Sequence, residues 1–275
     1  MGLCVAALNS GSNGNCYIIG TPEEFIMVDA GLSCREVEKR LSGLGLSASG
    51  LKAILITHEH SDHISGLLSI VKKLSVPVYI TAITLSHAGL ELDQVFFFER
   101  FVPIKIGRLT VTAFPKFHDA SDPHSVIVEG YGSTAGVFTD IGQPCANVMR
   151  YFKQCHAVFL ESNYEEAMLA DSRYPVFLQR RISGQQGHLS NAQALQLFLG
   201  HRSSFLTHLI LSHLSKENNR PETVEALFQP HAAGLVMMVA PRDRATPLFV
   251  LSSTPPAKLT TPAKTGRHQY QLSLF

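Results

Sequence analysis

Short apolar runs, separated by turns rich in Gly, Ser and Asn, make up the first half of the chain. Apolar runs of this length that are bounded by turn residues predict buried β-strands. The predicted strands of this half are Leu3–Leu8, Cys16–Ile19, Phe25–Val28, Ala53–Ile56, Val76–Ile80 and Leu109–Phe114. Those of the second half are Ser125–Val128, Ala135–Thr139, Ala157–Leu160, Leu209–Ser212 and Val236–Val239.

Helical patterns are interleaved with these strands. Ser33 and Glu36 have the spacing of a capping box, which predicts a helix that runs through Leu41. Further helical stretches lie near Ala192–Leu199 and Pro221–Phe228. No repeat of fixed period is present, which argues against a solenoid. We therefore expect one mixed α/β (α+β) domain over residues 1–241.

The end of the chain has a different composition. No acidic residue follows Asp243, and the segment from Ser252 to Gly266 is rich in Pro, Thr and Ala without periodicity. This composition predicts a disordered linker over residues 242–275. The linker ends in an apolar cluster, residues 269–275, which a purely solubilising tail does not need.

Overall composition excludes several classes of protein. The formal net charge is +1, so no global field favours nucleic acid, a membrane or an acidic partner, and any basic binding surface must be local. The five cysteines form no CxxC pair, which suits reduced thiols. The apolar stretch Leu3–Leu8 lacks the basic region of a signal peptide, and no apolar run approaches the roughly 20 residues of a membrane span. We expect a soluble, cytoplasmic protein.

Four potential metal ligands crowd one turn after the predicted strand at 53–56. The sequence from His58 to His63 reads His-Glu-His-Ser-Asp-His and leads into an apolar helix that starts at Leu67. Imidazole and carboxylate groups suit zinc, manganese or iron, and a loop after a rigid strand can direct several of them to one point. A solvated His-rich loop is the alternative, but it needs no such crowd of ligands. The predicted metal ligands in this turn are His58, His60, Asp62 and His63.

The motif Thr-His-x-His-x-Asp-His at 57–63 resembles the signature of the metallo-β-lactamase superfamily. The resemblance implies a four-layer αββα sandwich with metal ions at one edge of the sheets. It also implies further site residues, each of which follows a predicted strand: Asp29, His118, Asp140 and His213. In the family, the early Asp at the position of Asp29 supports the ligand loop.

Carried over residue by residue, the resemblance implies two divalent metal ions, with zinc or manganese expected and iron as an alternative. The first ion would be bound by His58, His60 and His118, the second by Asp62, His63 and His213, and both by Asp140. Two ions roughly 3.5–4 Å apart can activate a water and stabilise the entering and leaving oxygens of an in-line displacement. Such a site suits a phosphodiester.

Other histidines compete for two of these positions. His124 is an alternative to His118, and His201 and His208 are alternatives to His213. We favour His118 and His213, because each lies just past a strand end, from which a side chain can project into the site. Packing or surface positions are expected for the histidines without motif context, which are His87, His156, His231 and His268.

Four further stretches resemble one branch of the superfamily, the bacterial YycJ/WalJ-like proteins, which are themselves similar to tRNase Z and other phosphodiesterases. These stretches are Asn9–Cys16, Leu160–Asn163, Gly187–Asn191 and Leu211–Asn219. The resemblance implies a nuclease, in studied relatives a 5′-to-3′ exonuclease on duplex DNA linked to mismatch repair. The chain lacks the extra β-CASP module and any obvious long arm for gripping tRNA, which disfavours tRNA maturation.

The branch motifs contain candidates for catalysis. Asp62 is expected to be catalytic as well as a ligand. His188 is a candidate for the acid that protonates the leaving oxygen, as the similarly placed His of tRNase Z is thought to do; an incidental His in a turn before a helix is the alternative. Glu161 is a candidate for the residue that orients His188, although a strand-end Glu paired with a buried Arg would have the same sequence.

The loop at 10–15 can present backbone N–H groups to a phosphate, but a simple hairpin turn explains it equally well. The predicted substrate contacts are Ser10, Ser12, Asn13, Asn15, Asn163, Ser190 and Asn191. Relatives generally have His after the Asn at 163, where this chain has Tyr164, so a substrate contact is expected to differ there.

The last five residues match the short motif by which many bacterial replication and repair proteins bind the sliding clamp. They are Gln271, Leu272, Ser273, Leu274 and Phe275. Three apolar anchors on a disordered tether can dock into a groove while the glutamine makes a polar contact. An edge strand is the alternative, because apolar residues alternate from Tyr270.

The sequence as a whole predicts a two-metal phosphodiesterase, a 5′-to-3′ DNA exonuclease in replication-coupled or mismatch repair that is tethered to the sliding clamp. An alternative within the same fold is a metallo-hydrolase of a small thioester, lactone or cyclic phosphodiester. A clamp-bound scaffold with a structural metal is disfavoured, because structural sites need no open position for water.

Overall fold

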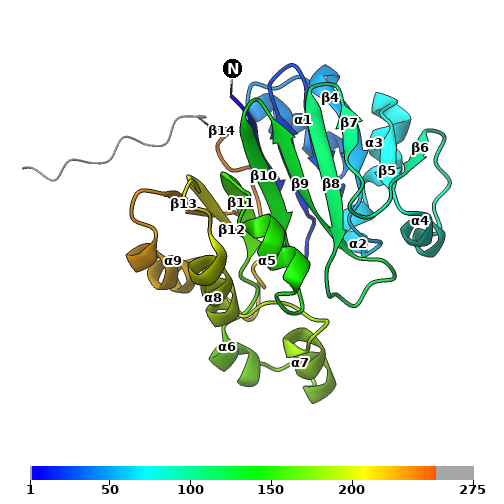
Figure 1. The fold of residues 1–275 in the computed structure, drawn as a ribbon. Coiled ribbons are helices and arrows are strands. Elements are labelled where there is room, and N and C mark those ends of the chain that lie inside the picture. The colour runs from blue at the N-terminus through cyan, green and yellow to red at the C-terminus, as the bar shows by residue number, and fades with distance from the viewer. Residues whose placement is uncertain (1, 252–275) are drawn as a thin grey trace, which may run out of the picture.

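Two seven-stranded β-sheets face each other in the computed structural model, which describes residues 2–251 (Figure 1). In spatial order, the first sheet contains β14 (Phe249–Val250), β1 (Cys4–Asn9), β2 (Cys16–Gly20), β3 (Phe25–Val28), β4 (Leu51–Leu55), β5 (Val78–Ile80) and β6 (Val95–Phe97). The second contains β13 (Val236–Val239), β12 (His208–Ser212), β11 (Ala157–Glu161), β10 (Ser133–Phe138), β9 (His124–Gly130), β8 (Leu109–Pro115) and β7 (Ile104–Ile106).

Helices cover the outer face of each sheet (Figure 1). Beside the first sheet lie α1 (Cys34–Gly43), α2 (Ser61–Ile64), α3 (Leu67–Leu74) and α4 (Ala82–Ala88), with the short 3-10 helix η1 (Ala48–Gly50). Beside the second lie α5 (Ala146–Phe152), α8 (Asn191–His201) and α9 (Pro221–Phe228), with η2 (Gln229–His231). Two further helices, α6 (Glu166–Ala170) and α7 (Val176–Ser183), lie between β11 and α8 in the chain. The Ser33 hydroxyl caps α1 by accepting the N–H of Glu36, as its sequence predicts.

Three buried apolar clusters separate the four layers. The central cluster joins the inner faces of the two sheets, where the rings of Tyr17 and Phe159 lie with their centroids 4.8 Å apart. A second cluster packs α1 and α3 on the first sheet, and a third packs α5, α8 and α9 on the other. This arrangement confirms the αββα sandwich that the sequence predicts.

All of the predicted strands are present, and three short ones were not predicted: β6, β7 and β14. The last of these changes the outline of the domain. Residues 242–251, where the sequence predicts a linker, return to the first sheet, and β14 pairs with β1. The backbone N–H of Leu251 donates to the carbonyl of Leu3 at 2.7 Å. The predicted clamp-binding peptide, 271–275, lies outside the described residues.

The parallel strands of both sheets position the site. β3 and β4 run parallel in the first sheet, and β10, β11 and β12 run parallel in the second. The carboxyl ends of parallel strands meet at one edge of a sheet, where loops can carry functional side chains. All five cysteines, which lie among the described residues, are free thiols. None of the helices within 2–251 is long and apolar enough to cross a bilayer.

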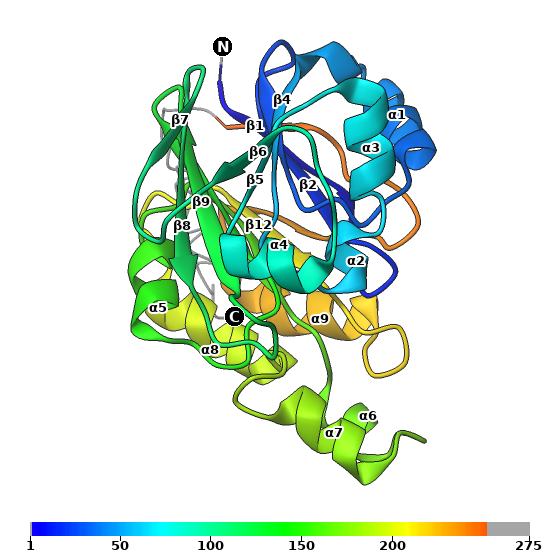
Figure 2. The ribbon, with the colours of Figure 1, turned by 90° about the vertical axis from the view of Figure 1, so that its right-hand side faces the viewer.

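Residues 165–187, between β11 and α8, form an arm that contains α6 and α7. Figure 2 shows both helices projecting away from the two sheets. No residue of α7 is buried, whereas each of the other long helices packs a row of buried side chains against a sheet. The arm therefore contributes little to the core.

Candidate metal centre

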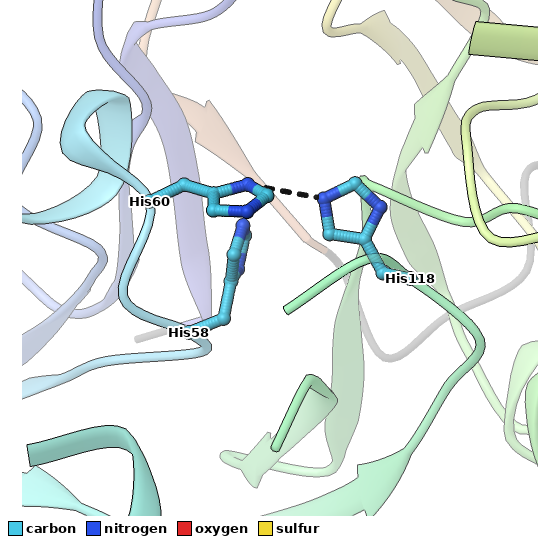
Figure 3. A group of neighbouring side chains, drawn as sticks. All are labelled: His58, His60 and His118. Carbon is cyan, nitrogen blue, oxygen red and sulfur yellow. Dashed lines mark hydrogen bonds between the residues drawn. The ribbon is translucent and has the colours of Figure 1, made fainter. Parts of the chain in front are cut away.

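Three histidines from two loops meet at one end of the sandwich (Figure 3). His58 and His60 follow β4, and His118 follows β8. One nitrogen of each ring lies within 4.8 Å of those of the other two, and His118 Nε2 is 3.3 Å from His60 Nδ1. Three nitrogens at this spacing can bind one ion.

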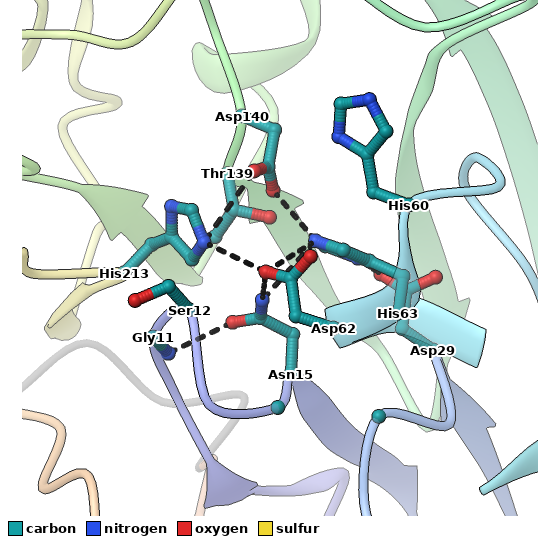
Figure 4. Close-up of polar contacts among 12 residues, drawn as sticks. Gly11, Ser12, Asn15, Asp29, His60, Asp62, His63, Thr139, Asp140 and His213 are labelled. Atoms are coloured by element: carbon teal, nitrogen blue, oxygen red, sulfur yellow. Dashed lines mark hydrogen bonds and ion pairs between the residues drawn. The ribbon is translucent and has the colours of Figure 1, made fainter. Parts of the chain in front are cut away.

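A second group lies beside the first and consists of Asp62, His63 and His213 (Figure 4). Asp62 and His63 belong to α2, whereas His213 follows β12 in the other sheet. Asp62 Oδ2 is 3.5 Å from the Nε2 atoms of both His63 and His213. Candidate ligands that follow strands of both sheets therefore meet at one point.

Asp140, two residues after the end of β10, lies between the two groups. Its Oδ1 is 3.4 Å from His213 Nε2 and 3.8 Å from His118 Nε2, while its Oδ2 is 3.3 Å from His63 Nε2. One carboxylate thus reaches both groups. The structure brings all seven predicted ligands together: His58, His60, Asp62, His63, His118, Asp140 and His213.

The second nitrogen of each candidate ligand ring is hydrogen-bonded to an oxygen. The pairs are His58 Nδ1 with Thr57 Oγ1 (2.9 Å), His60 Nε2 with the Asp119 carbonyl (3.2 Å), His63 Nδ1 with Asp29 Oδ2 (2.8 Å), His118 Nδ1 with the Gly187 carbonyl (3.0 Å) and His213 Nδ1 with Glu161 Oε1 (2.9 Å). The carbonyl and carboxylate oxygens of these pairs can only accept. The Thr57 hydroxyl also accepts from His58, because it donates its own hydrogen to Asp29. Each bonded nitrogen therefore carries a proton, and the other nitrogen faces the site, where it can bind an ion once it holds no proton of its own.

Two buried atoms of the site have no hydrogen-bond partner: His58 Nε2 and Asp140 Oδ2. An unsatisfied buried polar group costs about 1–3 kcal/mol, which a bound ion would offset at both atoms. Imidazole and carboxylate ligands suit zinc, manganese and iron. The residues present therefore fit a pair of divalent cations.

The charges of the site also favour cations. Burial lowers the pKa of His118 to about 3 and that of His58 well below its ordinary value, so both rings are neutral at pH 7, as ligands must be. Burial by itself raises the pKa of Asp62, but His63 and His213 lower it to about 2. Burial lowers the pKa of His213, but Asp140, Asp62 and Glu161 raise it to about 10. The carboxylates thus stabilise positive charge at this point.

Three residues at strand ends around the site have left-handed backbone conformations. The φ angles of Asp29, Asp140 and His213 are 61°, 56° and 56°. Residues other than glycine rarely adopt this conformation, and such conformations concentrate at functional sites. Here the sharp turn after β3, β10 and β12 leaves each side chain directed at the ligand groups.

Asp29 supports the ligand turn, in agreement with the family resemblance. Its Oδ1 accepts the backbone N–H of Thr57 at 2.8 Å, and its Oδ2 accepts the Nδ1–H of His63. Thr57 links this carboxylate to His58 through its hydroxyl. The supporting role of Thr57 was not predicted, although the residue belongs to the recognised motif.

The loop at 10–15 mainly contacts the ligands. The side-chain amide of Asn15 donates to Asp62 Oδ2 at 3.0 Å, and its backbone N–H donates to the Asp62 carbonyl at 2.7 Å. The hydroxyl of Ser10 accepts the backbone N–H of His213 at 2.7 Å. Of the predicted substrate contacts in this loop, Ser12 lines the pocket over the ligands, and the amide of Asn13 donates to the Arg242 carbonyl.

The other predicted substrate contacts also divide into two groups. Asn163 lines the pocket and donates to the His213 carbonyl at 2.8 Å. Ser190 and Asn191 are buried; Ser190 caps α8, and Asn191 is hydrogen-bonded to Ser162. Tyr164 is buried outside the pocket lining, and burial raises its pKa to about 12.

Glu161, fully buried at the end of β11, lies beneath the pocket. It accepts the backbone N–H groups of Asp140, Ile141 and Leu189, and its Oε1 accepts the Nδ1–H groups of His188 and His213 at 2.8 and 2.9 Å. The predicted contact with His188 is therefore present, and none of the described arginines pairs with this carboxylate. Burial by itself raises the pKa of Glu161, but His188 and His213 lower it to about 2.

The competing histidines lie apart from the ligand groups. His124 is bonded through Nδ1 to the Asp122 carbonyl, and His208 to the Thr207 hydroxyl. His201 is the last residue of α8. Among the histidines without motif context, His87 lies on α4, His156 accepts the N–H of Thr134, His231 lies in η2, and His268 lies outside the described residues.

Sequence reasoning missed Lys116, which is buried beside the site. Its ammonium donates to the Thr139 carbonyl at 2.6 Å, and burial lowers its pKa. No motif signalled it, because a Lys two residues before a candidate ligand has the pattern of a surface position. It places a fixed cation next to the strand end that carries Asp140.

A pocket of about 260 Å³ opens over the two ligand groups. Its wall includes Asp62, Asp140, His188 and His213 from the site and Tyr174, Arg181 and Ile182 from the arm. The fold, the ligand groups and this pocket define a hydrolase of the metallo-β-lactamase superfamily.

Comparison with known proteins identifies the family of the chain more narrowly. The family model described as "Metallo-beta-lactamase superfamily" matches residues 10–140. The exodeoxyribonuclease YycJ of Bacillus anthracis is 34% identical over 227 residues, which cover 81% of this chain and 86% of that protein. The exodeoxyribonuclease WalJ of Streptococcus pneumoniae is 31% identical over 232 residues, which cover 81% and 85%.

The fold is also found in the crystal structure of the metallo-β-lactamase fold protein YhfI from Bacillus subtilis. It has a TM-score of 0.68 and 17% sequence identity, over 90% of this chain and 99% of that chain. The chain therefore belongs to the metallo-β-lactamase superfamily, and within it to the family of YycJ and WalJ.

Proposed function

We propose that this protein is a two-metal phosphodiesterase that degrades DNA from the 5′ end. The observation that carries the proposal is the pair of ligand groups that share Asp140 below an open pocket. The substrate class is supported by YycJ and WalJ, which are named exodeoxyribonucleases and match this chain over most of their length.

In this proposal, His58, His60 and His118 would hold one cation, Asp62, His63 and His213 would hold the other, and Asp140 would contribute to both sites. Zinc or manganese is expected, with iron as the alternative. When bound, two such ions supply an activated water at neutral pH and stabilise the charge that develops on a phosphodiester. Asp29, Thr57 and Asn15 keep the ligands oriented through the hydrogen bonds described above.

His188 is proposed as the general acid. Its Nδ1–H is held by Glu161, so its Nε2 is the nitrogen available to the pocket that the ring lines. A proton on Nε2 can be donated to the leaving oxygen of the substrate, a contribution of typically 10²–10⁴ to the rate. Because Glu161 also holds His213, one carboxylate positions the acid relative to a candidate ligand.

The test is hydrolysis of end-labelled duplex DNA by the purified protein with Mn²⁺ or Zn²⁺, compared with the Asp62→Ala and His63→Ala variants. We expect metal-dependent nucleotide release that both variants lose. Label at the 5′ end should appear in the first products, whereas label at the 3′ end should persist in long fragments. Hydrolysis confined to small esters, or none on any substrate, would overturn the proposal.

The proposal includes a cytoplasmic role in replication-coupled or mismatch repair, with tethering to the sliding clamp by residues 271–275. Support for the tether comes from the sequence motif alone. A bound clamp would raise the effective concentration of the enzyme at replicating DNA. Deletion of Gln271–Phe275 should abolish capture by immobilised clamp, and unchanged capture would remove this part of the proposal.

A further inference from the structure

The arm, residues 165–187, joins the candidate metal centre to a surface that the proposed mechanism does not use. Tyr174, Arg181 and Ile182 line the pocket from the arm. On the same arm, the side chain of Phe177 is 73% exposed. A large aromatic side chain at this exposure, on a helix that projects from the body (Figure 2), indicates a contact surface.

Arg181 is fixed at the mouth of the pocket by a single hydrogen bond. Its Nε donates to Asp119 Oδ2, and its two Nη groups have no protein partner within residues 2–251. The side chain is 59% exposed. A guanidinium held in this way presents its remaining N–H groups in a planar fork, which matches the oxygens of a phosphate.

Asp119 sets the position of this guanidinium relative to the ligands. Its Oδ1 lies 3.5 Å from His118 Nε2 and 3.9 Å from His60 Nε2, and its carbonyl accepts the Nε2–H of His60. A phosphate bound by Arg181 would therefore lie next to the metal centre.

Phe177 and Arg181 are four residues apart on α7, so they lie on the same face of the helix. Val176 and Arg180 form an equivalent pair on the neighbouring face, and Arg180, unlike Arg181, does not line the pocket. A cation that binds the backbone beside an aromatic ring that stacks on bases is the combination by which proteins hold single-stranded nucleic acid.

We propose that Arg181 binds a backbone phosphate adjacent to the scissile phosphodiester and that Phe177 stacks on a base of the same strand. The arm would then hold an unpaired strand end over the metal centre. This inference rests on the proposed nuclease function and adds to it the form of the substrate at the site, a single strand. A protein partner or a second copy on the exposed apolar side chains is the competing explanation.

Binding of a fluorescent phosphorothioate oligothymidylate, which resists hydrolysis, tests the proposal without requiring turnover. In the metal-loaded protein, we expect Arg181→Ala to weaken binding at least tenfold and to reduce the slope of log K against log salt by about 0.7, the value for one phosphate contact on a single strand. We expect Phe177→Ala to weaken binding at least fivefold. The matched controls Val176→Ala and Arg180→Ala should change binding less than twofold.

Hydrolysis of bis(p-nitrophenyl) phosphate and the bound metal content separate this role from simple support of the ligands. The loss of kcat/KM in Arg181→Ala should be at least tenfold greater on DNA than on the small diester. Equal losses on both substrates, together with lost metal, would show that Arg181 only positions Asp119 and would overturn the proposal. A changed oligomeric state of Phe177→Ala in sedimentation, with unchanged DNA binding, would overturn it in favour of a protein partner.

The two proposals fail in different ways. If the wild-type protein binds the oligonucleotide through Arg181 but releases no nucleotides from DNA, the nuclease proposal fails, and only the binding of a single strand by the arm stands. If it degrades DNA and the variants bind as tightly as the controls, the arm proposal fails alone. Absence of any DNA binding would overturn both.

Discussion

The Nδ1 of His188 lies 2.8 Å from Oε1 of Glu161, and the same oxygen accepts a hydrogen bond from His213. The proposed acid and a candidate ligand are thus held by one buried carboxylate. This arrangement leaves the outer nitrogen of His188 available to the substrate, because the inner nitrogen carries the bonded proton.

Replacement His188→Gln should lower kcat on DNA by about 10²–10⁴, because the leaving alkoxide is no longer protonated. Hydrolysis of bis(p-nitrophenyl) phosphate should fall much less, since p-nitrophenolate leaves without a proton. Steady-state kinetics on both substrates, with metal analysis, check this. Equal losses on the two substrates would rule out the role of acid.

Removal of single ligands should change metal content in a defined way. His118→Ala removes a ligand of the first group and His213→Ala one of the second, so each should retain about one ion. Asp140→Ala should weaken both sites, because its carboxylate reaches both groups. Elemental analysis after dialysis gives the stoichiometry, and an Asp140→Ala protein that keeps two ions would contradict the shared position.

Metal affinity should rise with pH. The pKa of His213, raised to about 10 in the cation-free site, means that Nε2 holds a proton at pH 7 that an ion must displace. The apparent dissociation constant should therefore fall about tenfold per pH unit for each displaced proton, until the pH passes that pKa. Calorimetric titration with Mn²⁺ in buffers of different ionisation enthalpy counts the protons, and a count of zero at pH 7 would contradict the expectation.

Asn15→Ala should weaken metal binding about 10–100-fold, because an outer hydrogen bond to the candidate ligand Asp62 is lost. Gln154→Ala, which removes an exposed side-chain bond to the Arg150 carbonyl, is the control. The measurement is competition with a chromogenic chelator. Equal affinities in the two variants would show that Asp62 needs no such support.

Gly31→Ala should disrupt the ligand turn. A Cβ at this position would lie 1.8 Å from the Asp62 carbonyl oxygen, so the turn that carries Asp62 and His63 must move. Gly200, in α8, has open space around it, and Gly200→Ala should raise stability by about 0.4–1 kcal/mol. Thermal unfolding and metal content compare the two, and a Gly31→Ala protein with normal metal content would show that the turn adapts.

Much of the fold could be predicted from the sequence, because the strands are short, apolar and separated by clear turns. The strands that were missed have weaker patterns. Phe96 and Phe97 of β6 are 51% and 62% exposed, so the run does not alternate between a buried and a solvated face. β14 has two residues, and its place beside β1 depends on a pairing with the other end of the chain.

The candidate ligands could be predicted because each lies in a segment that follows a strand and belongs to a recognised motif. Their supporting contacts were not, because these depend on packing between distant segments. Asn15 had the pattern of a phosphate-binding or hairpin loop, but its amide reaches Asp62, 47 residues away. The position of the arm could not be predicted, because nothing in its composition indicates that Arg181 contacts Asp119, which lies 62 residues earlier in the chain.

The ligand turn at 58–63 is made early in the chain, whereas His213 comes from the second sheet, close to the end of the domain. During translation, the ribosome must pass residue 213, and the segment that follows must leave the exit tunnel, before both ligand groups can close. A nascent chain, or one terminated before residue 213, therefore lacks a complete set of candidate ligands, so half-made copies cannot assemble the proposed metal centre.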